Sequence, residues 1–248
     1  MKKIYCAYGD EKFHEKLLVT EETAISVGKV DEFYAFRRND LNVDNFLENN
    51  KEILSQLDPG GGLWAWKPFV ILQTMDKVDD GDIVIHTSTG MKVLDNLDPL
   101  FEITARSKDQ RMFFDSPTIY HPHLHSQYTK RDCFIVMGLD EPKYWGARML
   151  NAAFCVFMKT QPNIDFLKEF LRYTTDKRAI QDTIPAMPPP SGVSNLPDFR
   201  EHRFDQAILS LLRLKYNGEL YRDPSQLGND VMDKFPNSPY GQLFYMYD

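Results

Sequence analysis

The first 90 residues alternate between short apolar runs and amphipathic stretches, and this alternation constrains the fold more than any other feature of the chain. Apolar runs at residues 4–8, 32–36 and 83–87 predict strands, and helical spacing at 12–26, 45–57 and 68–78 predicts helices between them. Strands that alternate with helices form mostly parallel sheets with both faces covered. We therefore expect an α/β fold in which the 83–87 strand is central and parallel.

The rest of the chain is less regular. An apolar run at residues 151–159 predicts a strand, and the stretches 163–173 and 203–216 predict helices. Thr129 and Asp132 have the spacing of a capping box and predict a helix start. Residues 184–197, rich in Pro, Ser and Gly, predict a surface loop, and the aromatic tail 235–248 is expected to pack across the body. We expect one domain over residues 1–248, with a mixed sheet of about seven strands.

Composition and charge exclude several classes of function. The formal net charge of -7 argues against nucleic acid as a partner. No apolar stretch approaches the ~20 residues of a transmembrane segment, and the N-terminal apolar run is too short for a signal peptide. The three cysteines lack paired spacing, so neither disulfides nor a thiolate zinc site is expected, and Cys6 and Cys155 are predicted to be buried. These features predict a cytoplasmic protein.

A glycine run precedes the third predicted helix. Gly60, Gly61 and Gly62 come shortly before Lys67 and Pro68, and a proline fits the first turn of a helix. Glycines let backbone amides approach a ligand, and a helix N-terminus with a nearby lysine favours a phosphate. The same residues also fit a plain loop before a packed helix, with both tryptophans of the segment in the core. The spacing does not match that of a P-loop.

Several segments, in their order along the chain, resemble a family of GT-A nucleotide-sugar transferases that occurs in bacterial polysaccharide clusters and in large DNA viruses, including chloroviruses. The segments are 7–10 (AYGD), 62–68 (GLWAWKP), 81–90 (GDIVIHTSTG), 129–132 (TKRD), 151–154 (NAAF), 201–206 (EHRFDQ) and 220–226 (LYRDPSQ). No single motif is decisive, but their shared order is specific. The resemblance covers most of the chain, from residue 4 to residue 228.

The resemblance implies a GT-A fold, with residues 1–90 as the nucleotide-binding half and residues 91–248 as the acceptor and catalytic half. In both halves it assigns residues to a nucleotide-sugar donor. Ala7, Tyr8 and Gly9 would hold the base and ribose, and Trp66 and Lys67 would lie near the ribose or diphosphate. Arg148 would contact a phosphate and Asn151 a sugar hydroxyl, although Arg148 fits an ordinary surface arginine equally well.

Residues 86–90 fall where the family carries an acidic metal-binding motif. Ser88 stands in place of the usual aspartate and follows His86 and Thr87, and the resemblance places all three residues at the donor. Divalent cations that bridge a diphosphate prefer carboxylate oxygens, so a Mn²⁺ or Mg²⁺ cofactor is doubtful and no metal ligand is assigned. Three alternatives stay open: a metal-independent enzyme, weak metal binding through His86 and a distant acid, or impaired catalysis. The first is favoured, with the diphosphate neutralised by Lys67, Arg131 or Arg203.

A helix start at residues 202–206 contains the predicted catalytic base. The resemblance implies that an acid at such a helix start deprotonates the acceptor hydroxyl, and Asp205 is the candidate, with Asp132 in reserve. Either acid also fits a helix cap. The alternating histidines at 121, 123 and 125 lack a supporting acid or cysteine for zinc and are read as a loop. Aromatic side chains that fit either acceptor stacking or the core are Tyr120, Tyr128, Tyr144 and Trp145.

The predicted reaction transfers a sugar from a nucleoside diphosphate sugar to a hydroxyl of a glycan acceptor. The donor is expected to be UDP-linked and to carry a hexose, a deoxyhexose or a pentose such as xylose. A base at Asp205 implies inversion at the anomeric carbon. Two alternatives are a catalytically impaired module that binds sugar nucleotides, and a nucleotidyltransferase. The second alternative needs paired carboxylates for two metals, which residues 87–89 lack.

Overall fold

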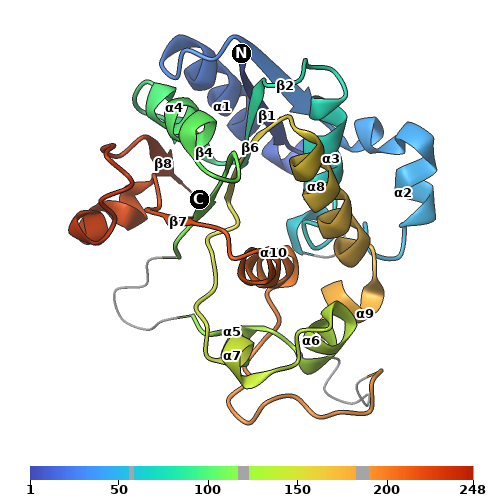
Figure 1. The fold of residues 1–248 in the computed structure, drawn as a ribbon. Helices are drawn as coiled ribbons and strands as arrows, with labels where there is room; N and C mark the ends of the chain where they lie inside the picture. The colour runs from blue at the N-terminus through green and yellow to red at the C-terminus, as the bar shows by residue number, and fades with distance from the viewer. Residues whose placement is uncertain (56–58, 117–122, 183–189, 248) are drawn as a thin grey trace.

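The computed structural model describes residues 1–55, 59–116, 123–182 and 190–247, and its centre is a six-stranded sheet of order β2-β1-β3-β6-β5-β7 (Figure 1). A two-stranded sheet pairs β4 with β8. The strands are β1 (Lys3–Tyr8), β2 (Glu32–Phe36), β3 (Ile83–Ser88), β4 (Met91–Val93), β5 (Arg111–Phe114), β6 (Phe154–Met158), β7 (Leu220–Tyr221) and β8 (Phe244–Met246).

The main sheet is mixed. β1 pairs in parallel with β2 and β3, and β5 with β7, whereas β6 runs antiparallel to both β3 and β5. The α/β prediction is confirmed, and β3 lies in the sheet interior. The prediction that β3 is parallel holds for only one of its two neighbours. Instead of about seven strands in one sheet, the described chain forms sheets of six and two, because the tail strand β8 pairs with β4 rather than with the main sheet.

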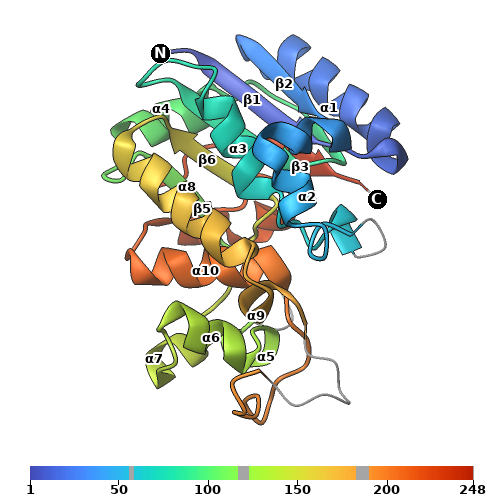
Figure 2. The ribbon, with the colours of Figure 1, turned by 90° about the vertical axis from the view of Figure 1, so that its right-hand side faces the viewer.

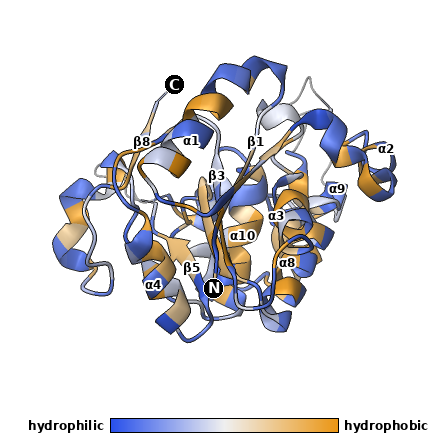
Figure 3. Cartoon of the chain, turned by 90° about the horizontal axis from the view of Figure 1, so that it is seen from above, coloured by the Kyte–Doolittle hydropathy of each residue, from blue (hydrophilic) through white to orange (hydrophobic). Residues whose placement is uncertain are grey.

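Helices cover both faces of the sheet (Figures 1 and 2). In β1, Ile4 and Cys6 belong to the core beneath α3, α8 and α10, whereas Tyr5 and Ala7 belong to the core beneath α1 and α4. Hydrophobic residues accordingly gather on the strands and on the helix faces turned toward them (Figure 3). The helices are α1 (His14–Ser26), α2 (Phe46–Asn49), α3 (Lys67–Met75), α4 (Asp98–Arg106), α5 (His125–Tyr128), α6 (Arg131–Met137), α7 (Pro142–Trp145), α8 (Gln161–Thr174), α9 (Lys177–Ile180) and α10 (Phe204–Lys215).

The helix predicted over residues 45–57 is mostly wrong. Only α2 is α-helical, and residue 57 lies outside the described residues. Asp44 and Asn45 have left-handed φ angles of 52° and 56°, which separate α2 from the preceding 3₁₀ segment. At its other end, the side chain of Asn50 donates to the carbonyl of Phe46 at 2.8 Å and closes the turn. Local polar bonds of this kind compete with helix continuation.

Other boundaries shift by a few residues. α3 begins with Pro68 in its first turn, as predicted, but ends at Met75 rather than Val78. The strand predicted over 151–159 is shortened to β6, and the helices predicted over 163–173 and 203–216 correspond to α8 and α10. The predicted loop at 184–197 lies partly outside the described residues; its described part, 190–197, contains no helix or strand.

The capping box predicted at Thr129 and Asp132 is wrong. The residue before α6 is Lys130, without a side-chain cap. The Thr129 hydroxyl lies 2.8 Å from Nδ1 of His125, and Asp132 accepts a hydrogen bond from the backbone of Ser191 at 3.0 Å. Both side chains therefore tie α6 to neighbouring segments instead of closing its first turn.

The C-terminal segment packs across the body, as predicted. β8 pairs with β4, and the buried guanidinium of Arg222 donates to the carbonyls of Tyr240 and Gly241. The three cysteines are buried and unpaired. Among the described residues, no helix is long and apolar enough to cross a membrane. The division into halves at residue 90 stays a prediction, although the main sheet draws strands from both sides of that position.

Candidate active site

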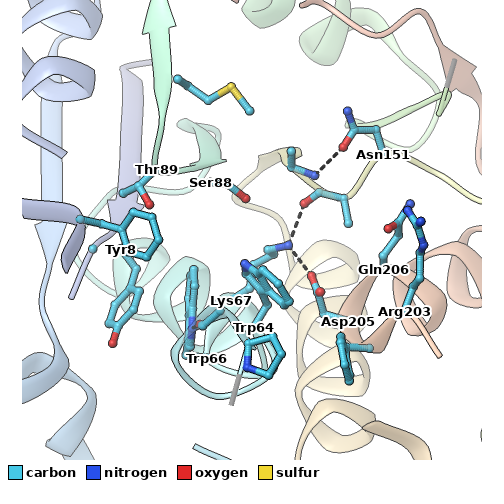
Figure 4. A pocket seen from close by; sticks show the side chains of 18 of the residues that line it. Tyr8, Trp64, Trp66, Lys67, Ser88, Thr89, Asn151, Arg203, Asp205 and Gln206 are labelled. Atoms are coloured by element: carbon cyan, nitrogen blue, oxygen red, sulfur yellow. Dashed lines mark hydrogen bonds and ion pairs between the residues drawn. The ribbon is translucent and has the colours of Figure 1, made fainter. Parts of the chain in front are cut away.

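A cavity of about 650 Å³ opens at the carboxyl ends of β1 and β3, where ligands bind in sheets of this kind (Figure 4). Other parts of its wall come from the loop before α3, the segment before β6 and the start of α10. These segments are distant in sequence, and the sheet order brings them together. Of the predicted site residues, those that line the cavity are Tyr8, Gly9, Trp66, Lys67, Ser88, Asn151, Arg203 and Asp205.

A buried ion pair joins two of these residues. The ammonium of Lys67, at the start of α3, pairs with Oδ2 of Asp205, in the first turn of α10. The two side chains are only 2% and 6% exposed. Lys67 also donates to the carbonyl of Ala152 at 2.7 Å, as Figure 4 shows. The predicted contact of Lys67 with a diphosphate stays a prediction, and this pairing does not favour it because the ammonium already has an anionic partner.

The surroundings of Asp205 affect its protonation in opposite directions. Burial raises the pKa of the Asp205 carboxyl above its ordinary value, whereas the Lys67 ammonium acts to lower it. Lys67 therefore supports the ionised form of an acid that burial alone would protonate. A carboxyl that borders a cavity, with a pKa raised by burial and a cation beside it that favours the ionised form, has the properties of a general base.

The glycine run shapes one wall of the cavity. Residues 60–64 all have left-handed φ angles, between 55° and 118°. Nε1 of Trp66 donates to the carbonyl of Gly60 at 2.9 Å, and the Trp66 ring packs on Tyr8 with centroids 4.2 Å apart. Both alternatives drawn from the sequence have some support: the loop packs closely against the protein, and it also borders the cavity. Its contact with a phosphate stays a prediction.

Substitution of Gly62 by alanine is expected to lower the free energy of unfolding by about 1–3 kcal/mol. Gly62 has a φ of 118°, and an added Cβ would lie 2.6 Å from Cα of Leu54. Gly81→Ala is the matched control, since Gly81 has a φ of 89° but no atom within 4 Å of an added Cβ. Urea titration of both variants measures the difference. Equal losses would show that the close approach to Leu54 contributes nothing.

Three predicted donor residues lie beneath the cavity rather than on its surface. Ala7, His86 and Thr87 are fully buried, and the Thr87 hydroxyl lies 2.6 Å from that of Tyr5. Burial lowers the pKa of His86 to about 3, and the Lys67 ammonium acts in the same direction, so the imidazole is neutral. The roles of these residues stay predictions.

Other predicted residues lie elsewhere. Arg131 pairs with Asp140 at 2.6 Å, and Arg148 pairs with Asp115 at 3.2 Å. Asp132 is buried beside the backbone of Ser191. None of these predicted residues lines the described cavity, and their predicted roles are untested. Of the three histidines considered for zinc, His121 lies outside the described residues.

Asn151 and Ser88 border the cavity from facing segments. The Asn151 amide donates to the buried Asp223 at 2.6 Å and its oxygen accepts from the backbone of Ala153 at 2.9 Å, which fixes the side chain. Ser88 ends β3 and follows the buried Thr87. Within the described ranges, no group of three or more His, Cys, Asp or Glu side chains is arranged to hold a metal ion. The doubt about a Mn²⁺ or Mg²⁺ cofactor stays a prediction.

Several lining residues were not predicted. Asp10 and Thr89 lie two residues beyond predicted strand ends, and Gln206 follows the predicted base, so their proximity in sequence would have found them. Met246 carried no local signal, because only the pairing of β8 with β4 brings it there. The remaining lining residues outside the predicted set are Phe13, Pro59, Gly60, Trp64, Met91, Ala152, Ala153, Asp182, Glu201, His202 and Phe204.

A second cavity of about 510 Å³ shares Gly9 and Asp10 with the first. Arg37 and Arg38, which follow β2, contribute to its lining, and Nη1 of each is buried without a hydrogen-bond partner. Two consecutive arginines directly after a predicted strand are a sequence signal for an anion site, although neither arginine was among the predicted site residues. Their position brings positive charge next to the main cavity.

No protein-family model matches the chain, and no curated protein matches its sequence. Among solved structures, mouse xyloside xylosyltransferase 1 in its apo form superposes with a TM-score of 0.50 at 11% identity, covering 100% of this chain and 98% of the other. The galactosyltransferase LgtC, in complex with donor and acceptor sugar analogues, gives 0.46 at 13% identity, with coverages of 98% and 86%.

The apo glycosyltransferase GlyE of Streptococcus pneumoniae TIGR4 gives a TM-score of 0.46 at 14% identity, covering 100% of this chain and 55% of the other. Identities this low bear on the fold alone. The xylosyltransferase match spans nearly the whole of both chains and agrees with the mixed sheet and its flanking helices. The chain therefore has the fold of GT-A glycosyltransferases.

Proposed function

We propose that this chain is a glycosyltransferase that moves a sugar from a nucleoside diphosphate sugar to a hydroxyl of a glycan acceptor. The observation that carries the proposal is the Lys67–Asp205 pair in a cavity at the carboxyl ends of β1 and β3. The GT-A fold supports the reaction class. The proposed donor is UDP-linked and carries a hexose, a deoxyhexose or a pentose such as xylose. The proposed source, a bacterium or a large DNA virus, rests on the sequence resemblance, whereas the proposed cytoplasmic setting rests on the cysteine pattern and the N-terminal sequence.

In the proposed mechanism the Asp205 carboxylate accepts the proton of the acceptor hydroxyl. The acceptor oxygen forms a bond to the anomeric carbon as the bond from that carbon to the diphosphate oxygen breaks. The electron pair of the broken bond leaves with the nucleoside diphosphate, and attack from the opposite face inverts the anomeric centre. Lys67 acts on Asp205, whose ionised form it stabilises, rather than on the leaving group.

Unpartnered guanidinium groups in the second cavity support a donor that spans both cavities. The main cavity is lined by the carboxylates of Asp10, Asp182, Glu201 and Asp205 and by the cations Lys67 and Arg203. Asp205 pairs with Lys67, and Glu201 with Arg203 at 3.1 Å. A diphosphate adds negative charge. The adjoining cavity is lined by Arg37 and Arg38 and also by the acids Asp10 and Glu11, but Nη1 of each arginine has no hydrogen-bond partner and is free to donate to a phosphate oxygen. We propose that Arg37 and Arg38 supply the neutralisation first expected from Lys67, Arg131 or Arg203.

Donor binding and turnover test the proposal directly. A panel of UDP-, GDP- and other nucleotide sugars is expected to include one that raises the melting temperature, because a ligand that binds only the folded state stabilises it. That donor is expected to release its nucleoside diphosphate, and both effects should persist in excess EDTA if arginines rather than a metal ion neutralise the diphosphate, as proposed above.

Each failure has a separate meaning. Binding without donor hydrolysis or transfer would favour a non-catalytic sugar-nucleotide module. Pyrophosphate release from a nucleoside triphosphate would favour a nucleotidyltransferase. Loss of donor binding in EDTA, restored by Mn²⁺, would contradict neutralisation by arginines alone and leave the transferase proposal intact.

A further inference from the structure

Two aromatic side chains from distant segments meet in the main cavity. Trp64 lies in the loop before α3, and Phe204 is the first residue of α10. Their ring centroids are 6.1 Å apart, with the ring planes inclined by 33°. Both side chains line the cavity, and both are half-buried, unlike Trp66 and Tyr8, which are 3% exposed. The cavity therefore has an aromatic wall that is accessible to a ligand.

The backbone at both aromatics is strained. Trp64 has a φ of 55° and Phe204 a φ of 37°, a region that bulky side chains rarely adopt. Strained residues persist only where the surrounding structure holds them, and they cluster at binding and catalytic sites.

The loop fixes the indole of Trp64 in position. A Cβ added to Gly60 would lie 2.3 Å from two ring atoms of Trp64, so the indole rests on the bare backbone of that glycine. The backbone carbonyl of Gly60 accepts a hydrogen bond from Nε1 of Trp66, and this bond anchors the loop to the start of α3. The Trp64 ring is therefore held against Gly60, and it remains half-buried where it lines the cavity. A preformed binding surface needs a side chain fixed in this way.

We propose that Trp64 and Phe204 form a platform for the pyranose ring of the acceptor, next to Asp205. A pyranose presents a face of C–H groups that packs on aromatic rings through dispersion and hydrophobic contact. Phe204 directly precedes Asp205, so a sugar on this platform would place a hydroxyl near the carboxylate. The assignment to the acceptor rests on the proposed function, in which Asp205 deprotonates that hydroxyl.

Binding of simple sugars, measured without donor or turnover, tests the platform. Methyl β-xylopyranoside, β-glucopyranoside and β-galactopyranoside are titrated by saturation-transfer NMR, and UDP by calorimetry. Trp64→Leu keeps an apolar side chain but removes the aromatic face, and it is expected to weaken binding of the preferred pyranoside at least about tenfold. UDP binding should stay within about twofold, and Trp64→Phe should retain most of the sugar affinity.

Phe33→Leu is the matched control, because Phe33 is also half-buried but stacks on Tyr5, with ring centroids 5.2 Å apart, and does not line the cavity. It should bind sugar as the unchanged protein does. Phe204→Leu is the second test variant. If Trp64→Leu fails to fold, Phe204→Leu must show the same result, namely weaker pyranoside binding with unchanged UDP binding.

Three outcomes would overturn the platform: no pyranoside binding by the unchanged protein, unchanged sugar binding in both leucine variants, or equal loss of sugar and UDP binding. Because the sugar is measured alone, absence of transfer activity would count against the proposed function and leave a selective loss in Trp64→Leu standing as evidence for the platform. Normal transfer together with unchanged sugar binding in both leucine variants would overturn the platform and leave the proposed function standing.

Discussion

Replacing Asp205 with asparagine is expected to slow sugar transfer by roughly 10²–10⁴-fold while donor affinity changes little. Asparagine has nearly the same shape but cannot accept the acceptor proton as a carboxylate does. Asp205 lies at the start of α10 and lines the main cavity beside its partner Lys67. The measurement is the rate of glycan product formation at saturating donor, together with the dissociation constant of the donor.

Asp132→Asn is the control, because Asp132 is a buried carboxylate that lies outside the cavity lining and bonds to the backbone of Ser191. It was the reserve candidate for the base, so this control also decides between the two acids. Near-normal transfer in Asp132→Asn together with the loss in Asp205→Asn supports Asp205. The reverse pattern would move the base to Asp132 and contradict the proposed mechanism.

The second large effect concerns stability. Removing either partner of the buried pair, by Lys67→Met or Asp205→Leu, is expected to lower the free energy of unfolding by about 3–5 kcal/mol, because the other charge is left uncompensated. Replacing both together removes both charges, and the double variant is expected to recover most of that loss. Urea unfolding of the four proteins at one pH gives the coupling energy.

Acid should partly rescue the Lys67→Met variant. Burial already raises the pKa of Asp205, and loss of the Lys67 ammonium removes the main influence that lowers it. The folded state of this variant then binds a proton that the unfolded chain has released, in the window between the unfolded pKa of about 3.9 and the higher folded value. Its stability should therefore fall as pH rises through that window.

Additive losses in the double variant would show that the two side chains contribute separately, and the proposed action of Lys67 on Asp205 would fail. A recovered double variant that remains inactive would separate the contribution of the pair to folding from its contribution to catalysis. Lys67→Arg provides a further comparison, since it keeps a positive charge at the same position.

The first half of the fold could be predicted because local patterns there agree with the final structure. β1, β2 and β3 are apolar runs bounded by turn residues, and Pro68 marks the start of α3. The α2 region failed because apolar spacing over 45–57 predicts a helix, while Asp44 and Asn45 take left-handed conformations that the spacing does not encode. The sheet of two strands depends on a pairing between β4 and β8 that is distant in sequence.

The sequence predicted where the site would lie better than it predicted the contacts within it. Strand ends and the glycine loop indicated where a cavity would form, and Tyr8, Ser88 and Asp205 do line one. The partner of Lys67 could not be predicted, because a lysine near a helix start suits a phosphate as well as a carboxylate. Only the packing of α3 and of α10 against α8 determines which anion lies within reach.

The burial of the Lys67–Asp205 pair also bears on how such a protein can evolve. The two residues are 138 positions apart, yet the loss of either leaves the other as a buried charge without its partner. In a lineage that no longer needs catalysis, a substitution of Asp205 alone still lowers the stability of the fold. A later substitution of Lys67 by an apolar residue would restore that stability and would be favoured by selection. Joint replacement of the pair by apolar residues would then mark descendants that kept the scaffold and gave up the chemistry.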